Sequence, residues 1–374
     1  MNLMMKSLIL AAGICALAPA QIPEKRIEVS PGQTLDVNLE TGGAISIQGG
    51  GGNTVTVKTS LTGPDAGDIQ VRVERTGKGV SIVSRFASGH SRRSGSADLE
   101  ITVPSRFDAE LKTMGGRIRI SNVEGQLHGS TMGGPLDLTA LKGKVELTTM
   151  GGAVTLTASQ VDGKVRTMGG KVMIKDVVGD IKSTSMGGNV VYDNVQRPGK
   201  GGDGKEVEIS TMGGEIDVAS APSGANVRTM GGAIHIGSAK GQVKAKTMGG
   251  NIEIKELDGA VIATTMGGDI QVTMVGDPAV GKRDVKLDSK GGEVHLTLPA
   301  GLSMDIDAQL EFTRSAASQY KIESDFPLAL TETPDWSEAH GSSRKTLKGT
   351  AVIAGGRAKI VIRTINGNIY INKR

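Results

Sequence analysis

The sequence contains very few of the residues on which disulfide-stapled domains and nucleic-acid-binding proteins depend. It holds one cysteine, one tryptophan, three tyrosines and four phenylalanines in 374 residues. The single Cys15 lies in the N-terminal segment, so the rest of the chain has no disulfide to staple it. Scarce aromatic rings exclude a stacking platform for single-stranded nucleic acid. The net charge of +4 comes from well-mixed acidic and basic residues, which excludes a strong field that would attract nucleic acid.

Long apolar runs are also absent beyond the N-terminal segment. Residues 1–20 combine Lys6, an apolar stretch from Leu8 to Leu17 and the sequence Ala18-Pro19-Ala20, which is the pattern of a cleaved secretory signal peptide. The apolar stretch is too short to span a bilayer. Ile14 precedes Cys15 where a lipoprotein signal needs a small residue, which argues against lipidation. We therefore expect an exported periplasmic or extracellular protein of the cell envelope, with no integral membrane segment after signal removal.

Glycine is abundant, with 55 residues, and much of it belongs to one repeated motif, T-M-G-G, in which Ser replaces Thr at the fifth copy. Successive copies recur with a period of about 18 residues, apart from one longer step between Met186 and Met212. A fixed short period indicates an array of one small structural unit. The methionines of the nine copies are Met114, Met132, Met150, Met168, Met186, Met212, Met230, Met248 and Met266.

Each repeat contains two segments with the polar–apolar alternation of half-buried strands. One segment follows the glycines, as in Asn251 to Ile254, and another precedes the threonine, as in Val243 to Thr247. Two short strands in so short a repeat leave no room for a crossover helix, and one unit cannot bury its apolar side alone. We therefore predict an all-β fold, a single-stranded parallel β-solenoid with about 18 residues per rung and neighbouring rungs ~4.8 Å apart. The usual rule for parallel connections favours a right-handed coil.

The glycine pairs indicate sharp corners, because glycine tolerates positive φ and close backbone approach. A phosphate-binding loop is a weak alternative, since the motif lacks the Lys-Ser/Thr and the helix of a P-loop. Methionine fills irregular gaps well, so we expect the methionine column to pack inward at the corner. The alternative is an exposed methionine ridge that could bind a soft metal such as Cu(I) or react with oxidants.

The chain divides into four parts by its pattern. Residues 1–20 form the signal peptide, residues 21–104 an N-terminal cap with irregular rungs, residues 105–298 the regular solenoid, and residues 299–374 a C-terminal cap with a final rung. Three segments interrupt this plan: 86–96, with His90, Arg92 and Arg93, and the insertions 196–203 and 275–282. We interpret them as surface loops and tolerated length variation. A local anion contact in the first segment and a binding face at the insertions are the alternatives.

The repeats resemble the bacterial putative-adhesin β-strand-repeat domains, a family of unknown function. Residues 30–37 followed by Thr41 to Ile45 are similar to the start of these domains, and Thr265 to Ile270 matches their tandem T-V-S-G-D-I units, with Met-Gly in place of Val-Ser. Leu298 to Gly301 and the segment from Gly355 to Ile371 are similar to their end. The resemblance implies an exported β-solenoid of the cell envelope, with roles in attachment or envelope-stress sensing, and supplies no catalytic residue.

Candidate catalytic groups do not gather in the sequence. Carboxylates such as Glu146, Asp217, Glu253 and Asp269 are interleaved with lysine, and no calcium-binding repeat is present. No nucleophile frame appears. The histidines lack the spacing of metal ligands, so we expect solvated side chains. A zinc ion shared by His128, His235 and His295, which come from different rungs, is the weaker alternative. The five histidines are His90, His128, His235, His295 and His340.

The sequence thus predicts a non-catalytic protein with no catalytic, cofactor-binding or metal-binding residue and no cofactor. We expect an adhesin-like scaffold or binding module whose partner is an envelope protein or a surface glycan, and not a nucleic acid. Two alternatives remain open. One is an envelope-stress sensor or regulator, and the other is a polysaccharide-active enzyme, which would need several acids gathered on one face of adjacent rungs.

Overall fold

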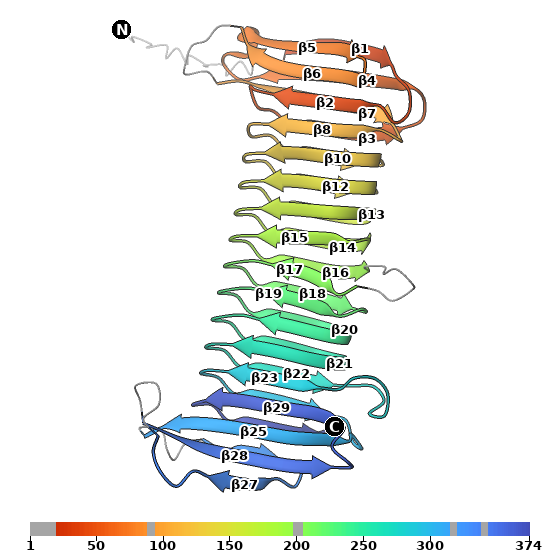
Figure 1. The fold of residues 1–374 in the computed structure, drawn as a ribbon. Helices are drawn as coiled ribbons and strands as arrows, with labels where there is room; N and C mark the ends of the chain where they lie inside the picture. The colour runs from red at the N-terminus through yellow and green to blue at the C-terminus, as the bar shows by residue number, and fades with distance from the viewer. Residues whose placement is uncertain (1–19, 88–93, 197–204, 315–319, 338–342) are drawn as a thin grey trace, which may run out of the picture.

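A computed structural model describes residues 20–87, 94–196, 205–314, 320–337 and 343–374. Figure 1 shows them as one tall column of stacked strands. Thirty strands and one short 3-10 helix, η1 (Ala66–Asp68), are the regular elements of this described part, which confirms the all-β class. The predicted signal peptide with Cys15, the histidines His90 and His340, and most of the insertion 196–203 lie outside the described residues.

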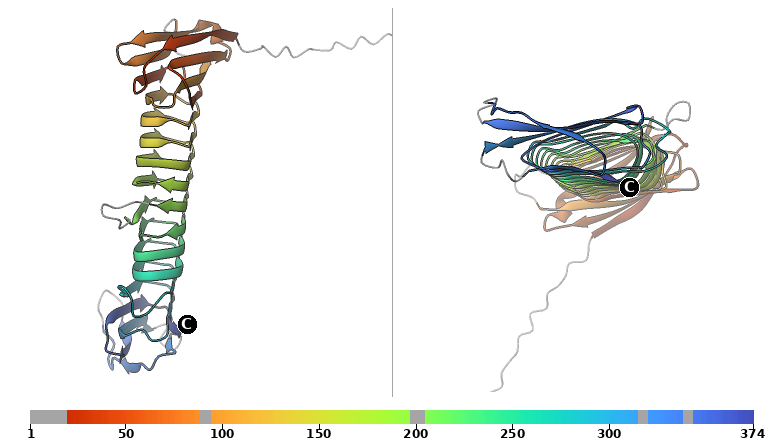
Figure 2. Two further views of the ribbon diagram at one scale, coloured as in Figure 1. Left: turned by 90° about the vertical axis from the view of Figure 1, so that its right-hand side faces the viewer. Right: turned by 90° about the horizontal axis from the view of Figure 1, so that it is seen from below.

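The middle of the column is a flattened coil with two long faces, visible end-on in Figure 2. The first face holds the strands that lead into the T-M-G-G corner, and the second face holds the strands that leave it. Strands β13 (Val154–Thr167), β20 (Ile234–Lys246) and β21 (Ile252–Thr265) bend from the second face into the first. The first face further contains β2 (Thr34–Leu39), β8 (Asp108–Thr113), β10 (Glu124–Thr131), β12 (Lys142–Thr149), β15 (Ile181–Ser185), β17 (Val207–Ser210), β19 (Ala225–Arg228), β23 (Val285–Ser289) and β29 (Ala358–Ile365). The second face further contains β3 (Ile45–Gly50), β9 (Ile118–Ser121), β11 (Leu136–Thr139), β14 (Val172–Val178), β16 (Val190–Gln196), β18 (Ile216–Ala221), β22 (Ile270–Met274), β24 (Val294–Leu298) and β30 (Ile369–Lys373).

Neighbouring rungs pair in parallel, and in most of the middle the paired residues are one repeat apart in sequence. On the second face Leu136 pairs with Val154, Val154 with Val172, and Val172 with Val190. All four side chains are fully buried. Because side chains alternate along a strand, the residues next to each of these four on its own strand point outward. The core is therefore a continuous stack of aliphatic side chains contributed by both faces.

The corner opposite T-M-G-G repeats a left-handed residue in each of five successive rungs. These residues have φ between 49° and 57°, a region that asparagine and aspartate tolerate better than most residues. An apolar residue follows the left-handed residue in most of these rungs, and Val123, Leu141 and Val177 are examples that are almost fully buried. In these rungs the turn is thus followed by an apolar side chain in the core. The left-handed residues are Asn122, Ala140, Ala158, Asp176 and Asn194.

Both ends of the column depart from the all-parallel arrangement that the sequence predicts. At the N-terminal end, β6 (Gly79–Phe86) and β7 (Ser96–Pro104) add in parallel to β2 and β3. Beyond them, β5 (Ile69–Thr76), β4 (Thr54–Thr62) and β1 (Ala20–Glu28) run antiparallel to their neighbours. Antiparallel strands can be joined by short turns, so a ribbon can fold back over the end of the coil. The parallel prediction therefore holds only for the middle of the molecule.

The C-terminal end of the column is likewise closed by antiparallel strands added beyond the parallel rungs. The last rung, β29 and β30, lies directly against β23 and β24. The preceding strands β25 (Met304–Thr313) and β26 (Ile322–Ser324) lie outside it, and β28 (Arg344–Ile353) and β27 (Ala329–Glu332) close the edge in antiparallel pairing. Phe312 meets Trp336 edge-to-face with ring centroids 6.0 Å apart. This bulky layer covers the last coil.

Candidate functional site

The threonine of the T-M-G-G corner points into the molecule. In one rung the Thr149 hydroxyl donates to the Gly134 carbonyl of the preceding rung at 2.8 Å and accepts from the Gly152 amide at 3.1 Å. Equivalent inter-rung bonds run along the column, including that of Thr364 to Gly292 at 2.7 Å in the last coil. Both hydrogen-bonding functions of the buried hydroxyl are therefore satisfied.

We expect Thr149→Val to lower the free energy of unfolding by about 1–3 kcal/mol, because it keeps the side-chain shape and leaves a buried carbonyl and a partly buried amide unpaired. The matched control is Thr139→Val, whose exposed hydroxyl bonds only to Thr157 at 3.1 Å among the interactions described. We expect the control to change stability by less than about 0.5 kcal/mol. Urea unfolding of both variants measures the difference, and equal effects would show that the inner hydroxyl bonds contribute nothing.

The second glycine of the corner is required by close approach of successive rungs. A Cβ atom on Gly152 would lie 2.1 Å from the Gly134 carbonyl oxygen, and one on Gly170 would lie 2.0 Å from that of Gly152. The first glycine is different, since a Cβ on Gly151 would meet nothing closer than 3.8 Å. Steric exclusion therefore explains one glycine of each pair.

The methionine of the motif points outward, and the expectation that it packs inward is wrong. All nine methionines are between 44% and 56% exposed. The threonine takes the inner position because its hydroxyl can bond to the rung above, whereas a thioether has only a weak acceptor for the same buried backbone groups. Nine thioethers therefore form an exposed line along one corner of the coil, which we call the methionine ridge (residues 114, 132, 150, 168, 186, 212, 230, 248 and 266).

The fold accepts other residues at the ridge position. In the rung after Met266 the same corner reads Ser289-Lys290-Gly291-Gly292, and the Ser289 hydroxyl bonds to the Gly268 carbonyl at 2.9 Å as the threonines do. Lys290 is exposed there. In the last coil Ile365 follows Thr364 at the equivalent place. Methionine is therefore not needed to build the corner.

The histidines that the structure describes are not brought together. His128 lies on the first face, in β10, while His235 and His295 lie on the second face, in β20 and β24. Each has a carboxylate of its own, and His235 lies 3.1 Å from Glu253. Among the described residues no group of three or more His, Cys, Asp or Glu side chains could hold a metal ion. A zinc ion shared by these histidines therefore has no support.

One of the scattered carboxylates, Glu146, pairs with cations on its own strand and on both neighbouring strands. Glu146 lies 3.1 Å from Lys144, 3.6 Å from Lys164 and 3.8 Å from His128. The hydrogen bond from Lys144 is the main cause that lowers the pKa of Glu146 below its usual value. A shared proton for acid catalysis needs a raised carboxyl pKa beside a second carboxylate, and this cluster has the opposite character.

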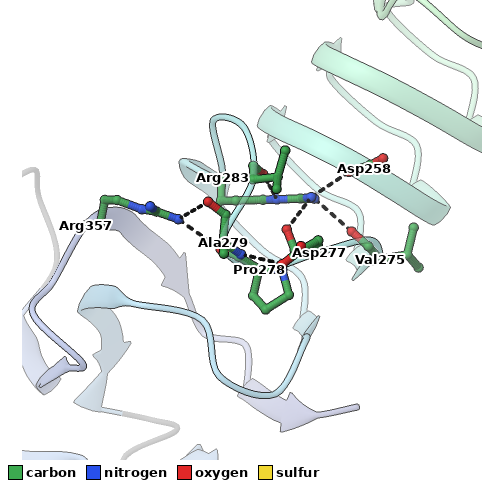
Figure 3. A network of polar contacts seen from close by, with 8 residues as sticks. Asp258, Val275, Asp277, Pro278, Ala279, Arg283 and Arg357 are labelled. Atoms are coloured by element: carbon green, nitrogen blue, oxygen red, sulfur yellow. Dashed lines mark hydrogen bonds and ion pairs between the residues drawn. The ribbon is translucent and has the colours of Figure 1, made fainter.

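The insertion at residues 275–282 is tied down by two arginines (Figure 3). The nearly buried Arg283 donates to the Asp258 carboxylate at 2.6 Å and to the carbonyl of Val275 at 2.8 Å. It also reaches the carbonyls of Val280 and Asp277, at 3.1 and 2.9 Å. From the C-terminal end, Arg357 donates to the carbonyls of Pro278 and Ala279. These hydrogen bonds hold the insertion in place as a structural loop. Sequence reasoning missed Arg283 because arginine is rarely buried.

The surface offers shallow depressions. One, of about 390 Å³, lies where β23, β25 and β29 end and β28 begins. Its charges are mixed, and Arg344 bonds to Glu311 across it at 3.0 Å. No helix of the described residues is long and apolar enough to cross a membrane.

Comparisons with known proteins give distant similarities. A cell adhesion protein of Clostridium sporogenes, named as putative, covers 96% of this chain and all of its own, with 10% identity and a TM-score of 0.21. A putative adhesin of Parabacteroides distasonis covers 74% of this chain and 97% of its own, with 14% identity and a TM-score of 0.29. A putative lipid binding protein of the same organism covers 75% and 97%, with 11% identity and a TM-score of 0.29. No curated protein matches the chain.

A family model also matches part of the chain. Residues 162–325, which include six copies of the corner motif, match the family described as Toastrack DUF4097. The matched segment contains most of the regular coil and β25. Residues 162–325 are thus similar to the Toastrack DUF4097 family, and the resemblance to a β-strand-repeat family of unknown function is confirmed.

Proposed function

We propose that this protein is a non-catalytic, exported scaffold of the cell envelope that binds a surface glycan or an envelope protein, in the manner of an adhesin. The observation that carries the proposal is the parallel stack of rungs, which presents two long faces of regularly spaced polar side chains. Such ladders suit extended, repetitive ligands. The named adhesins among the similar structures agree with this proposal without testing it.

Glu146 and Glu253 have no second carboxylate in register on either adjacent rung, which favours binding over hydrolysis at these two places. A polysaccharide-active solenoid needs carboxylates on adjacent rungs close enough to share one glycosidic bond. On the second face, the residues in register with Glu253 on the adjacent rungs are His235 and Gln271. On the first face, Glu146 is flanked by lysines. An envelope-stress sensor remains the alternative, and a bound regulatory protein rather than a glycan would favour it.

Two architectural features belong to the same proposal. The coil is right-handed, as connections between parallel strands usually are, and the regular part spans residues 105–298 between caps formed by residues 21–104 and 299–374. Export follows from the signal-like residues 1–20. Cell fractionation and N-terminal sequencing test export. We expect a processed chain that begins at Gln21 in the periplasmic or extracellular fraction, whereas an intact cytoplasmic chain would overturn this part.

The binding test uses the exported chain, immobilised by its C-terminus, on a glycan array and as bait in envelope extract. Two charge-reversal variants report which face binds. Lys144→Glu with Lys164→Glu changes the first face beside Glu146, and Lys175→Glu changes the second face beside Asp193, which lies 3.0 Å away. We expect one variant to lose the captured ligand at least about tenfold while the other keeps it. Hydrolysis of any captured glycan would refute the non-catalytic proposal.

A further inference from the structure

The residue at the ridge position is methionine in all nine T-M-G-G rungs, whereas the residue type at a neighbouring exposed position varies from rung to rung. Three residues after each methionine, the chain has seven different residue types in nine rungs, and all nine positions are outside the core. The ridge has methionine in all nine. Because both positions are outside the core, copying of the repeat alone does not explain the difference. The varied residues are Arg117, Pro135, Ala153, Lys171, Asn189, Glu215, Ala233, Asn251 and Asp269.

Neither packing nor corner geometry explains the ridge. Its side chains are about half exposed, and Lys290 occupies the same place in the next rung. An exposed apolar side chain gains little from burial, so leucine or lysine would serve the fold as well. What distinguishes methionine is its thioether sulfur, a neutral, polarisable donor that selects soft metal ions such as Cu(I).

Backbone hydrogen bonds hold the methionines in line. The Gly151 amide donates to the Met132 carbonyl at 3.1 Å, and the Gly169 amide donates to the Met150 carbonyl at 3.1 Å. Even across the longer step between Met186 and Met212, the Gly213 amide donates to the Met186 carbonyl at 2.9 Å. Neighbouring methionines are therefore one rung apart along the ridge, a distance of ~4.8 Å.

This spacing suits a metal ion between two sulfurs. Half of one rung spacing is ~2.4 Å. That is close to the ~2.3 Å of a bond between sulfur and a first-row metal such as zinc. Three rotatable bonds let each methionine side chain bring its sulfur to the ion. Both donors are uncharged, which favours a monovalent ion over a divalent one because no ligand offsets the second charge.

We propose that the methionine ridge binds soft monovalent cations, Cu(I) or Ag(I), each held by thioethers from neighbouring rungs. The proposal takes up the alternative of an exposed methionine ridge, which the sequence expectation of no metal site set aside in favour of methionines packed inward. Nine methionines form eight neighbouring pairs. Binding requires no change in the oxidation state of the ion and no covalent change in the protein. It is independent of the proposed adhesive function.

Local charge predicts which pairs fill first. Four of the methionines have a cation two residues earlier, namely Lys112, Arg166, Arg228 and Lys246, and nearby positive charge disfavours a bound cation. The pairs Met132 with Met150 and Met186 with Met212 have only Ser or Thr at that place. We expect these two pairs to bind before the others.

Two variants with equal numbers of methionines test the proposal. The alternating variant carries leucine at 132, 168, 212 and 248, so no two ridge methionines remain adjacent. The block variant carries leucine at 212, 230, 248 and 266, so the first five methionines remain a continuous line. Leucine has nearly the volume of methionine, and circular dichroism and thermal unfolding check that both variants keep the fold. Met173→Leu, a half-buried residue of β14 outside the ridge, is the control for an isolated thioether.

The measurement is titration of the full chain with Ag(I), and with Cu(I) under ascorbate against a chromophoric Cu(I) chelator. Spectra of 13C-methyl methionine identify the sulfurs that bind. We expect the block variant to keep about half of the bound ions and the alternating variant to bind about a hundredfold more weakly, because the second donor of a pair typically adds 10²-fold or more. Met132, Met150, Met186 and Met212 should shift first in the unsubstituted chain. Equal binding by the two variants, or no saturable binding by the unsubstituted chain, would overturn the proposal.

Discussion

Replacing Gly152 by alanine is expected to lower the stability of the coil by about 4 kcal/mol, a value at the upper end for single substitutions. The added Cβ would lie 2.1 Å from the Gly134 carbonyl oxygen and 2.4 Å from its carbon. Both atoms belong to the backbone, so no side chain can rotate away. The two rungs must separate locally, and the Thr149 bond to the Gly134 carbonyl would lengthen with them.

The control for this substitution is the adjacent glycine. Gly151→Ala places its Cβ 3.8 Å from the Gly133 carbonyl oxygen, an ordinary van der Waals contact, and φ of Gly151 is not positive. We expect a change of less than about 0.5 kcal/mol, the usual range for a surface substitution. Similar losses in the two variants would mean that close rung approach does not limit the corner.

A stacked coil loses stability locally, so the measurement must resolve rungs. Each rung contacts only its neighbours, and unfolding need not be two-state. Amide hydrogen exchange reports this directly. In Gly152→Ala the amides of β12 and β13 should exchange faster than those of β20 and β21, which lie several rungs away. Uniform acceleration along the column would indicate a cooperative collapse and not a local opening.

The repeat and its two-strand rung could be predicted from the sequence because the copies share the period and the polar–apolar alternation. The orientation of the corner could not. Thr and Met are adjacent, and only one of them can point inward. Apolarity alone favours methionine, but the inner position faces a carbonyl and an amide of the backbone, as Thr149 shows with Gly134 and Gly152. An unsatisfied pair of buried polar groups costs more than an exposed methionine.

The ends of the column were harder to predict for a different reason. Residues 50–104 alternate as strands do, but alternation does not distinguish parallel from antiparallel partners. Strand β2 pairs with the distant β8 on one edge, while β6, which lies between them in sequence, pairs with its other edge. At the other end β25 pairs with β29 and β28. Which distant strands pair depends on which sheet edge is exposed and must be covered, and no local sequence motif indicates that edge.

Replacing Arg283 by leucine should lower the free energy of unfolding by about 3 kcal/mol and release the loop 275–282. Arg283 is only 4% exposed, and its bonds satisfy the Asp258 carboxylate and carbonyls of the loop. Removing one member of a charged pair leaves the other group without its partner, which is costly where that group is buried. Asp258 is 37% exposed and can regain water, so the loss falls mainly on the carbonyls.

Arg357→Leu is the matched control, since Arg357 holds the same loop from the exposed side through the carbonyls of Pro278 and Ala279. Exposed contacts of this kind contribute little, so we expect less than about 1 kcal/mol. Trypsin cleavage after the exposed Lys282 provides a local measurement beside urea unfolding. Cleavage should accelerate strongly in Arg283→Leu and slightly in Arg357→Leu. If both variants are cleaved at the rate of the unsubstituted chain, the loop is held by the covering strands and not by its arginines.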